Sequence, residues 1–162
     1  MPEPKVREKP KGPTRAEGAC ACGGVKIEIG VPARWAWHDH GAAVQKAQGC
    51  AYATYVGSYR SRFRVLEGEN LIARYDDDVA GATRSWCARC GTPIAYENWA
   101  AKTMVNLPRA LFTSGVGREP LYHLRIEQEP AWAYRGERLK PLKGYPGVVW
   151  TGPKRKRRAD VL

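Results

Sequence analysis

Two closely spaced cysteine pairs, far apart along the chain, constrain the fold more than any other feature of this sequence. Cys20 and Cys22 form the first pair, Cys87 and Cys90 form the second, and a glycine follows each pair. Side chains two residues apart on a strand share a face, and a Cys-x-x-Cys at a tight turn brings two thiolates together. Zinc readily takes four thiolates in a closed structural site. The spacing therefore predicts one structural zinc ion that ties the beginning of the fold to its middle.

The cellular compartment bears on this interpretation of the cysteines. The segment that follows Met1 is not apolar, and no run of about 18 apolar residues predicts a membrane span. We therefore expect a cytoplasmic protein with no membrane partner. Thiols stay reduced in that compartment, where paired cysteines are typically metal ligands, and a redox pair or disulfides are the alternative. The fifth cysteine, Cys50, is interpreted as core filling, with a reactive thiol as the other option.

Composition and patterning predict an all-β domain of short, mainly antiparallel strands. Among 162 residues, 17 glycines and 12 prolines favour many turns, and no long amphipathic helix stands out. We expect a flexible basic arm over residues 1–17, one zinc domain over 18–150 and a basic tail over 151–162. Period-2 alternation and β-rich composition predict strands near residues 25–29, 51–59, 63–66, 71–75, 83–87, 94–96, 104–107 and 122–126, with a helical turn over 42–47.

The net charge of +11 leaves two interpretations open. Basic side chains attract nucleic acid or anionic surfaces through counterion release. They also keep a protein soluble, which is the interpretation that we favour, including for the run from Lys154 to Arg158. Nucleic acid or an acidic partner remains the alternative for the basic arms.

The cysteine motifs and two later stretches carry a family resemblance. In this order, residues 18–25 (GACACGGV), 86–94 (WCARCGTPI), 122–126 (YHLRI) and 130–132 (PAW) resemble the glutathione-dependent formaldehyde-activating enzymes, which share their domain with centromere protein V. The resemblance implies an Mss4-like fold, a tent of antiparallel sheets around a structural zinc. It also implies a carbon–sulfur lyase type of activity that joins or releases formaldehyde and glutathione, so glutathione or another small molecule is an expected partner.

The sequence departs from that family at its second motif, Cys-His-Cys-x-x-Cys, whose cysteines hold the catalytic zinc. A gap-free alignment back from Gly49 places His40 on the motif's histidine, and Asp39, Gly41 and Val44 on its three cysteines. A one-residue shift instead places histidines on the first two cysteines and an alanine on the third. Either alignment leaves no cysteine, whereas a catalytic zinc usually has three protein ligands and an open position.

The candidate catalytic residues are therefore His38, Asp39 and His40, in a degenerate motif. The two histidines would share one face of an extended segment and, with a further ligand such as Asp39 after a bend, Cys50 or His123, could hold a second metal ion. Alternatively, they are polar residues that fill an emptied cleft. His123 is interpreted as facing either this cleft or solvent.

Two functions follow from these observations. The first is a zinc protein of the formaldehyde-activating type, with its structural zinc and without a normal catalytic zinc. The second is a non-catalytic binding module that uses an aromatic cleft for a small ligand, or its basic arms for nucleic acid or an acidic partner. Six tryptophans could wall such a cleft, although we expect most of them in the core.

Overall fold

The computed structural model describes residues 14–133, 140–144 and 147–150. Both basic segments predicted at the ends fall largely or wholly outside these ranges. The described strands are β1 (Arg15–Ala19), β2 (Lys26–Gly30), β3 (Trp35–Asp39), β4 (Ala53–Tyr59), β5 (Phe63–Glu67), β6 (Ile72–Asp77), β7 (Ala82–Cys87), β8 (Pro93–Asn98), β9 (Met104–Pro108), β10 (Tyr122–Leu124), β11 (Lys140–Pro141) and β12 (Val148–Trp150). The helical elements are α1 (Ala42–Gln48) and the 3-10 turns η1 (Arg60–Arg62), η2 (Glu69–Leu71), η3 (Trp99–Ala101), η4 (Arg109–Leu111) and η5 (Ile126–Gln128).

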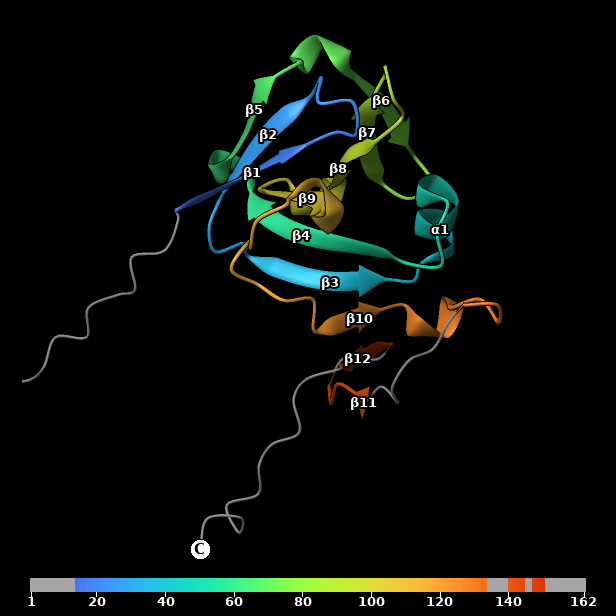
Figure 1. Ribbon diagram of the computed structural model, residues 1–162. Helices are drawn as coiled ribbons and strands as arrows, with labels where there is room; N and C mark the ends of the chain where they lie inside the picture. Colours follow the sequence, from blue (N-terminus) through green and yellow to red (C-terminus); the bar gives the residue numbers. More distant parts are fainter. Residues whose placement is uncertain (1–13, 134–139, 145–146, 151–162) are drawn as a thin grey trace, which may run out of the picture.

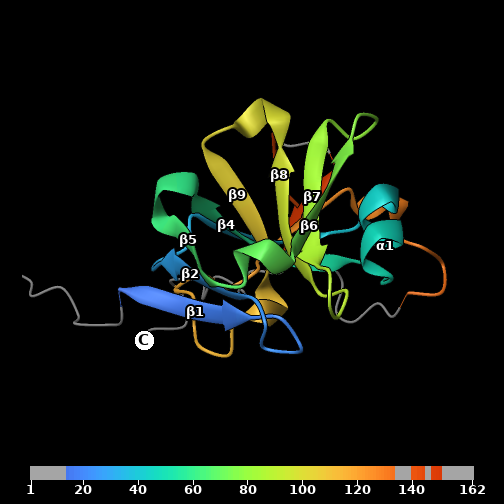
Figure 2. The ribbon, with the colours of Figure 1, turned by 90° about the horizontal axis from the view of Figure 1, so that it is seen from above.

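Two sheets organise the described part of the chain. The smaller has the order β1-β2-β5, and the larger has the order β11-β12-β10-β3-β4-β9-β8-β7-β6. The strands pair antiparallel, except that β10 runs parallel to β3. The smaller sheet lies across one end of the larger one, and α1 lies at the edge near β6 and β7 (Figures 1 and 2). The predicted all-β, mainly antiparallel class is confirmed.

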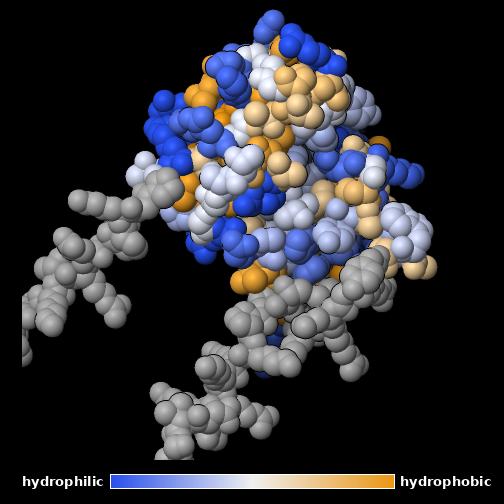
Figure 3. Space-filling model, in the orientation of Figure 1, coloured by the Kyte–Doolittle hydropathy of each residue, from blue (hydrophilic) through white to orange (hydrophobic). Residues whose placement is uncertain are grey.

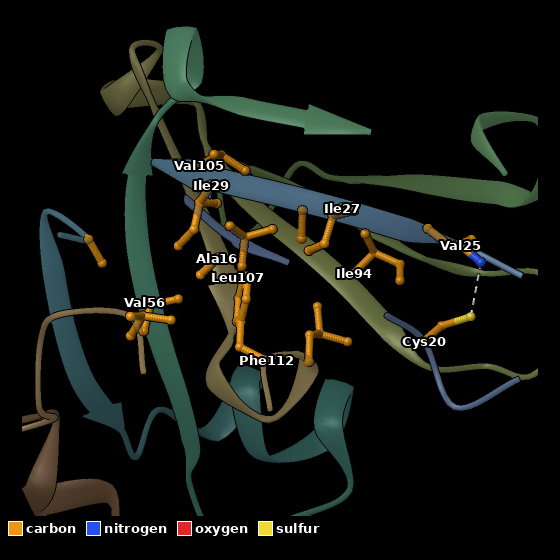
Figure 4. Packing of buried hydrophobic residues seen from close by; sticks show 14 of the residues in the cluster. Ala16, Cys20, Val25, Ile27, Ile29, Val56, Ile94, Val105, Leu107 and Phe112 are labelled. Carbon is orange, nitrogen blue, oxygen red and sulfur yellow. Dashed lines mark hydrogen bonds between the residues drawn. The ribbon is translucent and has the colours of Figure 1, made fainter. Parts of the chain in front are cut away.

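The core lies between the two sheets. Ile27 and Ile29 point inward from β2, as their alternation with polar residues predicts, and they are almost fully buried. They meet aliphatic side chains of the larger sheet (Figure 4), which include Val56, Ile94, Val105 and Leu107. Because Cys20 and Cys87 belong to the same buried cluster, the cysteine pairs are anchored in the core.

The tryptophans contradict the prediction that most of them are buried. Trp35, Trp99 and Trp132 are 54%, 39% and 73% exposed, and Trp37 and Trp86 are only partly buried. The core is filled instead by small and branched aliphatic side chains, which pack well between closely stacked sheets. Indole rings therefore remain on outer faces, where Trp99 Nε1 donates a hydrogen bond to Thr83 Oγ1 at 3.0 Å.

Two predicted boundaries also need correction. The arm was predicted to run to Glu17, but β1 begins at Arg15 and pairs with β2, where Ala16 is buried. The strand predicted over residues 122–126 ends at Leu124, because Arg125 adopts a left-handed conformation with φ of 56° and turns the chain into η5. In the described ranges, every helix is too short or too polar to cross a membrane.

Candidate functional site

The four predicted zinc ligands lie together at one edge of the core. Their Sγ atoms are all within 4.8 Å of one another, with Cys20 and Cys22 at 3.5 Å and Cys22 and Cys87 at 3.9 Å. A tetrahedral zinc–thiolate site with Zn–S bonds of about 2.3 Å separates its sulfurs by about 3.8 Å. The chain therefore brings the four cysteines to a geometry that is able to hold one zinc ion.

Backbone turns position each cysteine pair. The Gly23 N–H donates to the Cys20 carbonyl at 2.9 Å, and the Gly91 N–H donates to the Cys87 carbonyl at 2.8 Å. Both glycines have positive φ, of 71° and 73°, which favours glycine at the end of each turn. The Val25 N–H lies 3.2 Å from Cys20 Sγ, as expected for a donor that stabilises a thiolate.

The pKa values of the thiols indicate that the four sulfurs cannot all carry negative charge without a cation. The hydroxyl and N–H of Thr92 lower the pKa of Cys90 to about 5. The Gly24 N–H lowers the pKa of Cys22, but the thiols of Cys20 and Cys90 outweigh it and raise that pKa to about 11. Without an ion, negative charge on one sulfur opposes charge on the next. A divalent cation removes this repulsion, so the donor set fits zinc.

The three histidines of the chain meet in a second region, on β3, on β10 and directly after β3. His40 Nε2 and His123 Nδ1 are 2.9 Å apart, and the rings of His38 and His123 have centroids 4.7 Å apart. The ring of Tyr52 contacts both His38 and His40, so these two share one face as predicted. His123 is 8% exposed and faces this cluster rather than solvent. We call these four residues the histidine cluster.

Burial controls the protonation of the histidine cluster. Burial, followed by the nearby charges of His38 and His40, lowers the pKa of His123 to about 4. Burial, followed by the charge of His40, also lowers the pKa of His38, whose Nδ1 is hydrogen-bonded to Thr54 Oγ1 at 2.9 Å. The buried carboxylate of Glu129 lies 3.7 Å from His40 Nδ1. At neutral pH the rings of His38 and His123 are therefore uncharged.

Asp39 points away from the histidines and is held by other contacts. Its carboxylate is 3% exposed, accepts a 2.6 Å hydrogen bond from Arg125 Nη2 and accepts another of 2.9 Å from the Gly41 N–H. Opposite faces are expected for adjacent residues at the end of a strand. The Asp39 carboxylate is thus occupied in an ion pair and in closing the turn that precedes α1.

The other two positions that align with the family's catalytic cysteines also have structural roles. A Cβ at Gly41 would lie 2.4 Å from Arg125 Nε, so the guanidinium takes the space beside this residue. Val44 is 2% exposed and packs in a small core with Ala53 and Tyr55. Neither residue offers a ligand atom from its side chain, and Asp39 is already paired. The residues present do not fit a family-type catalytic zinc.

A cleft with a volume of about 680 Å³ lies between α1 and the strands β6 to β8. Lys46 and Arg84 give it positive charge, while Tyr75, Trp86 and Tyr96 give it aromatic walls. The Arg84 guanidinium stacks 5.1 Å from the centroid of the Tyr96 ring and lies 3.4 Å from the Asp77 carboxylate. Trp86 is the one tryptophan among the described lining residues. Two tyrosines and one tryptophan therefore supply the aromatic side chains of this cleft.

Cys50 packs against the small core around Val44, and burial raises its pKa. A raised pKa disfavours the nucleophilic thiolate. The interpretation of Cys50 as core filling is therefore supported over that of a reactive thiol.

Sequence reasoning missed the residues that complete the second region. Tyr52, Arg125 and Glu129 were not candidates, yet they contact His40 or Asp39. Their partners lie about 12 to 90 positions away in the chain, so no local pattern marks them. The one usable signal was the alternation around His123, which predicts a strand. That strand is β10, and it pairs His123 directly with His38 of β3.

The family model described as glutathione-dependent formaldehyde-activating enzyme matches residues 15–128. A crystal structure of a Rhodobacter sphaeroides protein is similar with a TM-score of 0.53 and 20% identity, covering 64% of this chain and 97% of that one. No curated protein matches. The structural similarity bears on the fold alone, and it agrees with the predicted Mss4-like architecture.

Proposed function

Because the chain belongs to the glutathione-dependent formaldehyde-activating enzyme family, we propose that it is a zinc-braced binding protein of that family and not a zinc-dependent carbon–sulfur lyase. One zinc ion, held by the cysteine quartet, stabilises the fold. The second metal position of the family is replaced by internal contacts. The cleft beside α1 then binds a small molecule with an anionic group, for which glutathione is the first probe.

The Asp39–Arg125 ion pair is the observation that carries this proposal. It fills the space beside the residues that align with the catalytic cysteines with a guanidinium, and it engages the one carboxylate among them. Zinc catalysis needs an ion with an open coordination position, where it can act as a Lewis acid. The Asp39 carboxylate is already paired with Arg125, and the side chains of Gly41 and Val44 offer no ligand atom, so the aligned residues supply no three ligands to hold it.

The cleft supports the binding role. Its volume of about 680 Å³ lies within the usual range for small-molecule sites, about 300 to 1,000 Å³. Lys46 is exposed at the cleft, so its ammonium can meet a carboxylate. The aromatic walls offer apolar area for the rest of a ligand.

Metal analysis and a turnover assay test the proposal together. We expect about one zinc ion per chain and no conversion of glutathione with formaldehyde above the uncatalysed rate. Calorimetry with glutathione should give binding that weakens in Lys46→Ala but not in Lys102→Ala, an exposed lysine outside the cleft. Turnover that depends on a second metal ion would overturn the proposal. If both variants bind glutathione equally well, the cleft is not the binding site.

A further inference from the structure

A face far from the cleft carries two adjoining pockets rich in arginine. It is formed by the end of β2, the turn η1 and the beginning of β3. The pockets have volumes of about 190 and 260 Å³ and share Gly30 and Arg62 in their walls. Hydrophilic residues cover this part of the surface, beside β5 (Figure 3). The arginines that line the two pockets are Arg15, Arg34, Arg62, Arg64 and Arg118.

The positive charge of this face is only partly neutralised. Glu28 pairs with Arg15 and lies 4.0 Å from Arg64. Within residues 14–133 and the later described stretches, the other three arginines form no ion pair with a carboxylate. Their combined field favours a ligand with several negative charges.

Backbone contacts hold two of these guanidinium groups in place. Arg62 Nη2 donates to the Val31 carbonyl at 3.1 Å, and Arg118 Nε donates to the Ala33 carbonyl at 3.1 Å. A guanidinium has five N–H donors, so each group keeps further donors after this bond. Arginines that are positioned beforehand lose less conformational entropy when they bind a phosphate.

Two exposed aromatic rings border the arginines. The Arg34 guanidinium lies 5.7 Å from the centroid of the Trp35 ring and 6.0 Å from that of Tyr59. Trp35 is 54% exposed and Tyr59 is 41% exposed. Exposed aromatic faces beside a row of cations form the kind of platform on which unpaired bases stack.

We propose that this arginine–aromatic face binds single-stranded nucleic acid. Phosphates lie in the two pockets against Arg34, Arg62 and Arg118, and bases stack on Trp35 and Tyr59. A duplex or an anionic membrane would use the arginines but would present no free base to the rings. The exposed rings therefore favour a single strand over these other polyanions. DNA and RNA share this chemistry, and the test separates them.

The test of this proposal measures how tightly the full-length protein binds fluorescein-labelled 15-mers of thymidine and of uridine. Fluorescence anisotropy follows the binding across a salt series. Arg34→Gln with Arg62→Gln should weaken binding by about tenfold at low salt and flatten the plot of log K against log salt by about 1.4, for two lost phosphate contacts. Trp35→Ala should weaken binding by about tenfold and leave the salt slope unchanged, because stacking involves no counterion.

The matched control removes two charges elsewhere, with Arg74→Gln and Lys143→Gln, both exposed and outside the two pockets. All variants keep residues 151–162, so binding by that basic segment is common to them, and thermal unfolding verifies their fold. Equal losses in the control and the pocket variant would overturn the proposal, as would absent binding. Two further outcomes would also overturn the proposal and assign the face to polyanions in general. One is that Trp35→Ala has no effect on binding, and the other is that a duplex or a phosphatidylserine vesicle binds as tightly as the 15-mers.

Discussion

The cysteine quartet and the region around the histidine cluster and the Asp39–Arg125 ion pair differ in what they offer a metal ion. In the quartet, every ligand is present and the sulfur distances suit zinc. In the second region, the three aligned positions are an ion-paired aspartate, a glycine packed against arginine and a buried valine. In the first region four side chains can meet one cation, whereas in the second region the side chains meet one another.

The largest effect should come from the quartet. Cys87→Ser removes a buried ligand, so zinc should be lost and the domain should lose cooperative unfolding, because metal binding in small zinc domains contributes on the order of 10 kcal/mol. Zinc content and circular dichroism during heating measure this. Cys50→Ser is the matched control, and it should keep its zinc and change stability by only about 1 kcal/mol. Similar behaviour of the two variants would contradict a metal role for the quartet.

The next effect should come from the ion pair that distinguishes the second region. Arg125→Met leaves the buried carboxylate of Asp39 without its cation, and we expect a loss of about 2 kcal/mol, less than for a fully buried pair because Arg125 is 38% exposed. Urea unfolding measures the change. Asp39→Asn in the same chain should restore part of the loss. If the two changes are simply additive, the pair does not stabilise the region.

A smaller steric effect should appear at Gly41. Its φ of −60° suits any residue, but a Cβ would meet Arg125 Nε at 2.4 Å, so Gly41→Ala should destabilise by about 1 to 2 kcal/mol. Gly115→Ala is the control, because nothing lies within 4 Å of its added Cβ. Arg125→Ala should abolish the extra loss caused by Gly41→Ala. A loss that persists in that background would point to a cause other than the guanidinium.

The last effect appears only in acid and concerns protonation of the histidine cluster. The pKa of His123 falls from 6.5 to about 4 on folding, so between these values the unfolded chain binds a proton that the folded chain does not. Stability is therefore full above pH 6.5 and declines as the pH falls toward 4. His123→Asn keeps an acceptor near His40 and should decline less steeply in urea unfolding over this range. Because zinc release in acid and the His38 titration are common to both proteins, parallel curves would show that His123 does not contribute.

The sequence predicts the parts of this molecule that depend on neighbours in the chain. The β2 alternation and the turns at Gly23 and Gly91 follow from local spacing, and the preference of zinc for four thiolates joins the two distant cysteine pairs. The failures lie where distant segments meet. Nothing near Arg125 indicates that its left-handed backbone ends β10 and directs its side chain to Asp39. The prediction that most tryptophans are buried fails for a related reason, since the volume between two sheets is set by all the strands together.

The parallel pairing of β10 with β3 has a consequence for biosynthesis. All four cysteines of the quartet are outside the ribosome once residue 90 emerges, whereas the second region also needs residues 123–129. Metal capture can thus precede completion of the histidine cluster, and a nascent chain would acquire its brace before its last long-range contacts form. A chain that ends at residue 108, the end of β9, and has left the ribosome therefore carries all four cysteines, although Asp39 still lacks the arginine that pairs with it.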